Sequence, residues 1–287
     1  MQNRKIERVI EAQATSDGAG VKLRRSLGSG PFARLDPFLM LDEFFSDNPD
    51  DYIAGFPPHP HRGFETVTYM LDGHMQHQDH MGNTGDIGPG GVQWMTAGRG
   101  VIHSEMPRQE AGRMRGFQLW VNLPAAEKMR PADWRDLPAE SIAEQAFDGG
   151  RARVIAGALE IDGQRTVGPI NGVDESMATD PVFADLVLEP GARVSLPVPG
   201  SHNALIYLYE GSAVVGDTAV PERAAGVLGD GESLELEAGD SGASLLLLAG
   251  RPLDEPVVQH GPFVMNTREE IEQAMRDYRD GSLAESH

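Results

Sequence analysis

Two short segments of the chain each carry a pair of potential metal ligands at alternate positions. His59 and His61 lie in HPHRGFE, and His103 and Glu105 lie further along in GRGVIHSE. Residues i and i+2 of a β-strand point to the same face, so the two pairs could converge inside a barrel. Three imidazole nitrogens and one carboxylate oxygen suit divalent iron, manganese, nickel, copper or zinc. The spacing therefore predicts a mononuclear metal site whose open coordination positions favour chemistry or ligand binding.

The composition excludes several other kinds of site. The 287 residues include no cysteine, which rules out disulfides, thiolate zinc sites and cysteine nucleophiles. Lys and Arg number 24 against 44 Asp and Glu, and the net charge of −20 disfavours direct contact with nucleic acid or an anionic membrane. The N-terminus lacks the apolar stretch of a secretory signal, and the longest apolar run, Leu245 to Ala249, is too short to cross a bilayer. We therefore expect a cytoplasmic protein.

The elements that position these residues are predicted to be strands. The 34 glycines and 20 prolines lie between short β-branched and apolar runs, which is typical of a mostly β protein with tight turns. The strands that we expect are Val21 to Ser26, Glu65 to Leu71, Gly91 to Thr96, Gly116 to Leu123, Arg153 to Ala158, Phe183 to Leu188, Leu205 to Glu210 and Ser244 to Ala249.

The chain also divides into two halves that resemble repeats of one unit. We expect an N-terminal domain over 1–135, a linker over 136–150 and a C-terminal domain over 151–287 that ends in a helix. Placing YMLDG (69–73) on YLYEG (207–211) sets His59 opposite Pro197 and His61 opposite Pro199. The second half also has no counterpart of the His103 and Glu105 pair. The comparison predicts that the second half keeps the scaffold without the metal.

The C-terminal helix is predicted from its capping residues. In NTREEIEQAMRDYRDG, Asn266 or Thr267 can cap the N-terminus and Glu270 can complete a capping box. Three residues recur at helical spacing and are expected to pack on the barrel: Ile271, Met275 and Tyr278.

Four segments of the chain resemble those of a known family. The segments HPHRGFE, GNTGDIGPGGVQWMTAG, GRGVIHSEMP and GPFVMNT are similar to those of the pirin family of the cupin superfamily. The resemblance implies a mostly β bicupin fold, with two antiparallel β-barrels of the jelly-roll type packed face to face and a C-terminal helix. It also implies one metal in the N-terminal barrel, first of all Fe(II), with Cu, Ni, Mn or Zn as alternatives. The ligands it implies are His59, His61, His103 and Glu105.

A general cupin takes its carboxylate ligand from the first motif, where this chain has Glu65. The pirin pattern takes it from the position of Glu105, so we expect Glu65 to neighbour the ligands or to pair with an arginine.

The resemblance implies a dioxygenase that cleaves a flavonol such as quercetin, with a small aromatic substrate and dioxygen as partners. Glu105 is then the only ligand able to act as a general base. The alternative is a non-catalytic redox sensor or co-regulator that acts through a protein partner. An isomerase or another cupin enzyme is a third possibility. We expect a monomer.

Other residues allow two interpretations. His74, His77 and His80 could form a second metal site, but their spacing favours a polar rim near the pocket mouth. Five apolar residues could line an aromatic pocket but are expected to form core: Phe64, Trp94, Met95, Phe117 and Trp120. Arg62 and Arg99 are expected to form structural ion pairs.

Overall fold

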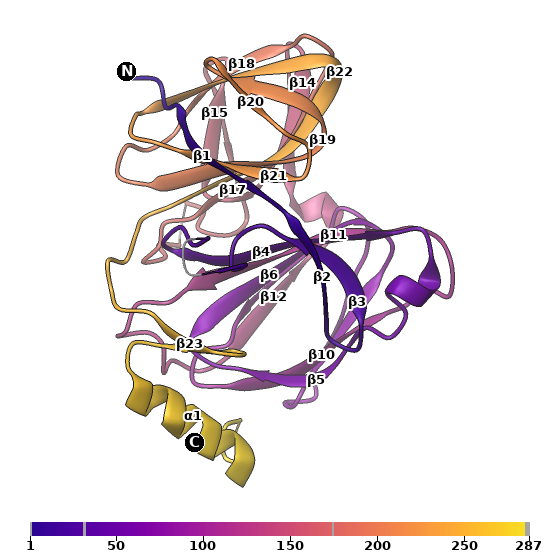
Figure 1. Cartoon of the computed structure of the whole chain (residues 1–287), viewed down its shortest axis with the longest axis vertical. Coiled ribbons are helices and arrows are strands. Elements are labelled where there is room, and N and C mark those ends of the chain that lie inside the picture. Colours follow the sequence, from indigo (N-terminus) through magenta and orange to yellow (C-terminus); the bar gives the residue numbers. More distant parts are fainter. Residues whose placement is uncertain (1, 31–32, 174, 285–287) are drawn as a thin grey trace. The chain divides into compact units, whose positions relative to one another are not determined.

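The computed structural model describes residues 2–30, 33–173 and 175–284, and these residues form two compact units (Figure 1). The N-terminal unit contains the described residues of Ala14–Arg25, Phe38–Ala139 and Leu253–His287. The C-terminal unit contains those of Met1–Gln13, Ser26–Pro37 and Glu140–Pro252. The two units are therefore not separated at a single point of the sequence. Instead, each unit takes in segments from outside its own half.

Two antiparallel sheets make up most of the N-terminal unit. The seven-stranded sheet has the order β12 (Asp133–Leu137), β9 (Val92–Thr96), β6 (Phe64–Asp72), β11 (Met114–Asn122), β4 (Phe38–Ser46), β3 (Val21–Arg25) and β2 (Gln13–Asp17). The four-stranded sheet has the order β5 (Phe56–His61), β10 (Val101–Pro107), β7 (Met75–Asp79) and β8 (Thr84–Ile87).

One apolar cluster joins the two sheets of this unit. Phe44, Met70 and Met114 from the larger sheet pack with Met75 and Ile87 from the smaller one. Because side chains alternate along a strand, the same face of β6 that carries Met70 also carries residues 64, 66 and 68. The space between the sheets therefore continues from this apolar cluster toward the histidine motifs.

A larger sheet organises the C-terminal unit. Its order is β1 (Ile6–Glu11), β21 (Ala224–Leu228), β19 (Asn203–Val215), β22 (Ser233–Gly250), β17 (Val182–Leu188), β14 (Gly150–Ala156) and β13 (Ala143–Phe147). β18 (Arg193–Pro197) pairs with β22, β20 (Thr218–Val220) pairs with β19, and β15 (Ala158–Ile161) forms a hairpin with β16 (Gln164–Val167). β19 shifts register against β22 at Leu208/Glu210 and Gly211/Ala213, so one pair of strands can serve both layers of a sandwich.

The mostly β prediction and the C-terminal helix are confirmed. Each expected strand overlaps an observed one, for example Glu65 to Leu71 within β6. The sheets are open sandwiches of the jelly-roll type rather than closed barrels. The predicted linker is also largely structured, because β12 ends within it and β13 pairs along β14. Gln145, in the middle of β13, is buried and its Nε2 donates to the carbonyl of Ile161 at 3.1 Å.

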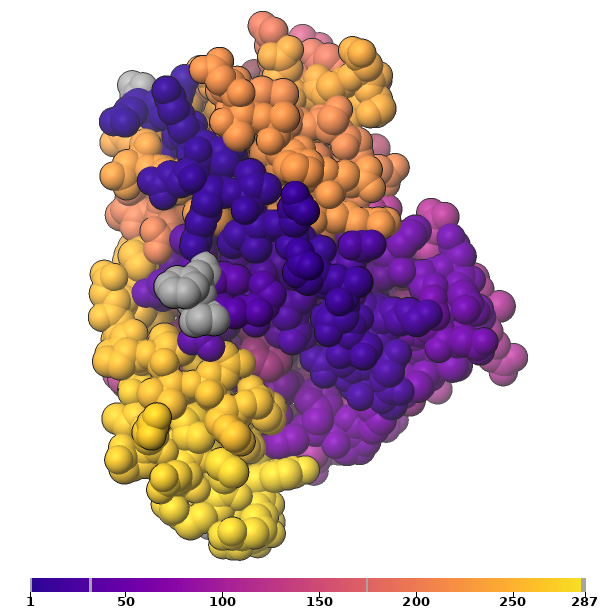
Figure 2. Space-filling view, in the orientation of Figure 1, coloured from indigo at the N-terminus to yellow at the C-terminus, as the bar shows by residue number. Residues whose placement is uncertain are grey.

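The C-terminal segment belongs to the N-terminal unit. It contains the hairpin β23 (Val258–His260) to β24 (Phe263–Met265) and the helix α1 (Arg268–Asp280). In Figures 1 and 2 this segment is yellow and lies next to the purple strands of that unit. Arg62 Nη1 forms an ion pair with Asp277 at 2.7 Å and its Nε donates to the carbonyl of Arg99, which confirms a structural role for Arg62.

Thr267 caps α1, and Glu270 completes the capping box as predicted. The predicted apolar stripe is only partly correct. Ile271 is buried, but Met275 and Tyr278 are 44% and 43% exposed, and Ala274 takes the buried position instead. A small alanine lets the helix approach the hairpin closely. No helix among the described residues has the length and apolar character needed to span a membrane.

Lys128 ties this segment to the sheet beneath it. Its side chain is 1% exposed, and Nζ donates to the carbonyls of Gly63 and Val264 and to Asn122 Oδ1, at 2.7, 3.1 and 2.7 Å. Burial lowers the pKa of Lys128 to about 8, so the ammonium group remains mostly charged at neutral pH. All three ammonium donors are used.

Replacing Lys128 with methionine should lower the free energy of unfolding by about 3 kcal/mol, because three buried acceptors lose their donor. Urea unfolding measures the loss, and amide exchange should increase at β24. Lys22→Met, at a largely exposed lysine, is the matched control. A loss below about 1 kcal/mol would contradict this role for Lys128.

Candidate metal centre

Three histidines converge between the two sheets of the N-terminal unit. β5 and β10 are antiparallel neighbours, with His59 opposite His103 and His61 opposite Val101. One ring nitrogen from each of His59, His61 and His103 lies within 4.8 Å of the other two. The ring centroids are 4.4 to 4.9 Å apart. Alternation on two paired strands thus brings the three imidazoles together, as the motif spacing predicts.

Each of these histidines has a ring nitrogen that is available to a ligand. His59 Nδ1 lies 2.8 Å from the Pro57 carbonyl, to which it can donate, and this leaves Nε2 with a lone pair. Neither nitrogen of His61, nor Nε2 of His103, has a hydrogen-bond partner among the described residues. Buried polar atoms without partners are rare in native proteins. A metal ion would use these lone pairs, so the three side chains fit one.

Burial keeps the imidazoles of His61 and His103 neutral. Desolvation, reinforced by the neighbouring His59, lowers the pKa of His61 well below its usual value. Desolvation and the three nearby histidines do the same to the pKa of His103. A neutral imidazole is the form that binds a metal. In the part of the chain that is described, these three histidines are the group suited to holding an ion.

Glu105 lies outside this group, in a hydrogen-bond network of its own. Its Oε1 accepts from Thr68 Oγ1 and its Oε2 from Gln118 Nε2, both at 2.8 Å. The pairing of β5 with β10 shifts register between His103 and Glu105, so Glu105 lies opposite Phe56. Strand alternation therefore places Glu105 on the histidine side, while the register shift sets its position relative to the rings.

Thr68 and Gln118 were not predicted from the sequence as site residues. They lie on β6 and β11, where Thr68 is directly opposite Gln118. The signal was a polar residue in the middle of an apolar strand, in TVTYM and in FQLW. Trp120 Nε1 donates to Gln118 Oε1 at 3.3 Å and extends the network.

Aromatic rings enclose His61. The rings of Phe64 and Trp120 lie 5.1 and 5.3 Å from that of His61, both edge to face, and they pack on each other at 4.3 Å. Both residues are buried, as the core interpretation expects. Their indole and phenyl edges exclude water from one side of the histidine group.

His77 is a neighbour of the centre rather than part of a rim. It is fully buried, and its Nδ1 lies 3.1 Å from Nδ1 of His103. His74 and His80 are exposed, so the three residues do not form a second site. The interpretation of a polar rim is therefore wrong for His77, because β7 pairs with β10 and turns this residue inward.

Glu65 lies on the opposite face of β6 from Thr68. It is 1% exposed and accepts a hydrogen bond from Thr96 Oγ1 at 2.7 Å, whereas we expected it to neighbour the ligands or to pair with an arginine. Burial raises the pKa of Glu65 to about 7, although the hydrogen bond from Thr96 acts to lower it. It does not join the histidine group.

Glu65→Gln should remove a pH dependence of stability. The folded protein keeps the proton of Glu65 to about pH 7, while the unfolded chain loses it near 4.5, so wild-type stability falls as the pH rises through this interval. The difference amounts to about 3 kcal/mol. Urea unfolding at pH 5 and 8 should show a smaller fall in the variant. Glu235→Gln, at an exposed residue, should behave like wild type, and equal falls in all three proteins would refute this account.

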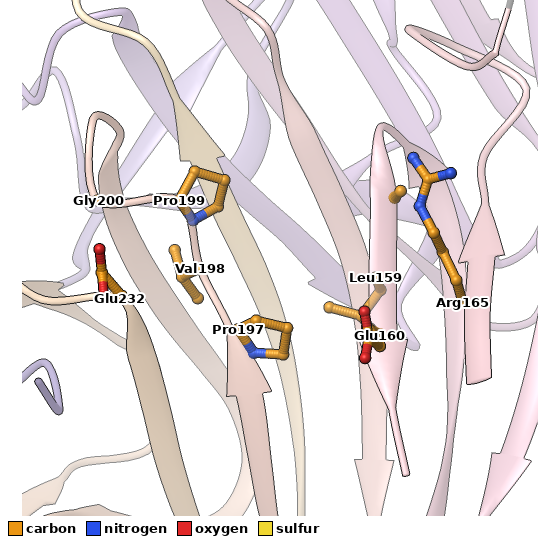
Figure 3. A pocket seen from close by; sticks show the side chains of 9 residues that line it. Leu159, Glu160, Arg165, Pro197, Val198, Pro199, Gly200 and Glu232 are labelled. Atoms are coloured by element: carbon orange, nitrogen blue, oxygen red, sulfur yellow. The ribbon is translucent and has the colours of Figure 1, made fainter. Parts of the chain in front are cut away.

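The C-terminal unit packs aliphatic side chains where β18 meets β22. β18 pairs with the start of β22, with Leu196 opposite Leu234 and Val194 opposite Leu236. All four are buried in the core of this unit. Pro197 and Pro199, aligned with the histidines by sequence, instead line a cavity of about 300 Å³ with Glu232 and Arg165 (Figure 3).

Two antiparallel β units with a buried histidine group in one of them define a protein of the cupin type. Sequence comparison agrees: the Pirin family profile matches residues 20–121, and that of the Pirin C-terminal cupin domain matches residues 183–284. The chain belongs to the pirin family.

Individual relatives cover nearly the whole chain. A Pseudomonas aeruginosa protein with the provisional name quercetin 2,3-dioxygenase is 56% identical over 94% of both chains. Pirin of Homo sapiens is 42% identical over 97% of this chain and 93% of its own. The crystal structure of quercetin 2,3-dioxygenase from Acinetobacter baumannii is 34% identical, with a TM-score of 0.88 over 98% of this chain and 99% of that one.

Proposed function

We propose that this protein is a metal-dependent dioxygenase that cleaves a flavonol such as quercetin. His59, His61 and His103 would hold one divalent transition metal, with Fe(II) the first candidate, and Glu105 would be the fourth ligand. The observation that carries the proposal is the convergence of three imidazoles, of which His61 and His103 are buried and have ring nitrogens without a hydrogen-bond partner among the described residues. The names of the relatives from Pseudomonas aeruginosa and Acinetobacter baumannii support the substrate.

When bound, the ion would supply Lewis-acid chemistry that acidifies the 3-hydroxyl of the flavonol and favours reaction with dioxygen. Both oxygen atoms of dioxygen enter the ring-opened product, and C3 leaves as carbon monoxide. The flavonol needs to lose its hydroxyl proton first.

Glu105 would accept that proton. Thr68 and Gln118 each donate one hydrogen bond to it, and a carboxylate offers about four lone-pair positions. One position on each oxygen therefore remains for the substrate proton or the ion. The two donors also fix the orientation of the carboxylate, which a general base requires.

Phe64 and Trp120 would keep water away from the reacting groups. Their rings cover His61 on the side of β6 and β11. Exclusion of bulk water strengthens electrostatic interactions at the centre and limits side reactions of an activated flavonol.

Aerobic assays with quercetin test the proposal. The protein is stripped of metal and reconstituted separately with iron(II), manganese, cobalt, nickel, copper and zinc. We expect metal-dependent loss of the flavonol absorbance, with release of one carbon monoxide for each flavonol consumed. The absence of metal-dependent turnover with every one of these ions would refute the proposed activity.

A further inference from the structure

His77 contacts the histidine group from the neighbouring strand. β7 pairs with β10 so that His77 lies opposite Glu105. Its ring centroid is 4.9 Å from that of His103, and the two Nδ1 atoms are 3.1 Å apart. This is hydrogen-bond distance, and both side chains are buried.

The hydrogen bond restricts where the protons of the two rings lie. Of two neutral imidazoles joined through their Nδ1 atoms, one must donate and the other must accept. If His103 donates, its Nε2 keeps a lone pair. If His77 donates, His103 carries its proton on Nε2 and cannot bind an ion there. Only the first arrangement leaves His103 Nε2 free, and this atom has no other partner among the described residues.

Trp134 holds His77 in this orientation. The indole ring on β12 stacks on the imidazole with centroids 5.5 Å apart and planes 25° from parallel. His77 is thus fixed by a ring on one side and by the hydrogen bond to His103 on the other. Its Nε2 has no hydrogen-bond partner in the described chain, so among the described residues its ring is hydrogen-bonded through Nδ1, to His103.

We propose that His77 is a positioning residue that accepts the Nδ1 proton of His103 and so selects the tautomer of His103 that presents Nε2 to the metal. This inference rests on the metal site of the proposed function. The acceptor is a neutral imidazole, whereas the usual acceptor behind a metal-bound histidine is a carboxylate, carbonyl or water. A neutral acceptor makes His103 a weaker electron donor than a carboxylate would, and this favours a more Lewis-acidic ion.

The first test needs no metal and no turnover. Long-range ¹⁵N–¹H spectra of the metal-free protein report which ring nitrogen of each histidine carries the proton. We expect His103 as the Nδ1–H tautomer in the wild type and in His77→Gln, whose side-chain oxygen can still accept. In His77→Phe, which keeps a ring against Trp134, we expect a mixture or the Nε2–H tautomer. Nε2–H in the wild type, or an unchanged tautomer in His77→Phe, would overturn the proposal.

The second test is metal affinity, measured with zinc by competition against a chelator. Loss of a partner behind a ligand histidine typically weakens metal binding by about 10- to 100-fold, and we expect this for His77→Phe. His77→Gln should recover most of the affinity, and His74→Ala, at an exposed histidine, should match the wild type. Equal losses in His77→Phe and His77→Gln would show that only packing matters.

The tests separate this inference from the proposed activity. If the protein binds zinc and shows the expected tautomer but does not consume quercetin, the proposed dioxygenase activity is refuted and the role of His77 is supported. If His77→Phe does not fold, the wild-type tautomer and the His77→Gln affinity still decide the question.

Discussion

Replacing His103 with alanine is expected to abolish metal-dependent turnover and to weaken metal binding by more than about 100-fold, which exceeds the usual effect of losing a partner behind a ligand. His103 lies opposite His59 and contacts all three neighbouring imidazoles, so its loss removes the residue common to these contacts. The measurements are zinc competition and quercetin consumption by the reconstituted protein.

His74→Ala is the control for His103→Ala, because it removes an exposed histidine from the same unit. It should leave both measurements unchanged. Circular dichroism shows whether His103→Ala remains folded, since the change removes the buried Nε2 that has no partner but also the hydrogen bond to His77. Metal affinity in His103→Ala equal to that of the wild type would remove His103 from the ligand set.

The second large effect is expected for Glu105→Gln. The glutamine can accept from Gln118 through its oxygen, and it can donate to the hydroxyl of Thr68 through its nitrogen, so both contacts of Glu105 persist. The variant loses the basicity and the negative charge but keeps the shape. At saturating metal we expect turnover to fall by about 10²- to 10⁴-fold, the usual contribution of a general base.

The variant also tests whether Glu105 is a ligand. Metal affinity should fall by at least about tenfold if a carboxylate oxygen binds the ion, since an amide oxygen is a weaker donor. Gln118→Glu, at the donor beside it, is not a suitable control because it would place two carboxylates together. Glu110→Gln, at an exposed glutamate of the same unit, makes the same change away from this network and is the better comparison. Unchanged turnover in Glu105→Gln at saturating metal would exclude Glu105 as the base.

The convergence of the histidines was predictable because it depends on local alternation. HPH places His59 and His61 on one face of a strand, and HSE places His103 and Glu105 on one face of another. Pairing of these strands then brings the three imidazoles together, and the structure confirms the pairing. The capping box of α1 was equally predictable, because it depends on Thr267 and Glu270 alone.

The surroundings of the site were not predictable in the same way. Thr68, His77 and Gln118 come from three other strands, and their contacts depend on the register of each strand against its neighbour. Strand register is set by the packing of whole faces and by irregularities such as the shift beside Glu105. The sequence shows that His77 exists but not that it faces inward.

The amino-acid sequence by itself determined the mostly β architecture, the helix with its cap and the three histidines that face one another. These follow from side-chain alternation and local hydrogen bonding. Only the tertiary structure decided that Thr68 and Gln118 hold Glu105, that His77 supports His103, and that the C-terminal segment completes the N-terminal unit through Arg62 and Lys128. The physical reason is that such contacts join residues far apart in the chain, and their positions depend on how the strands pack together.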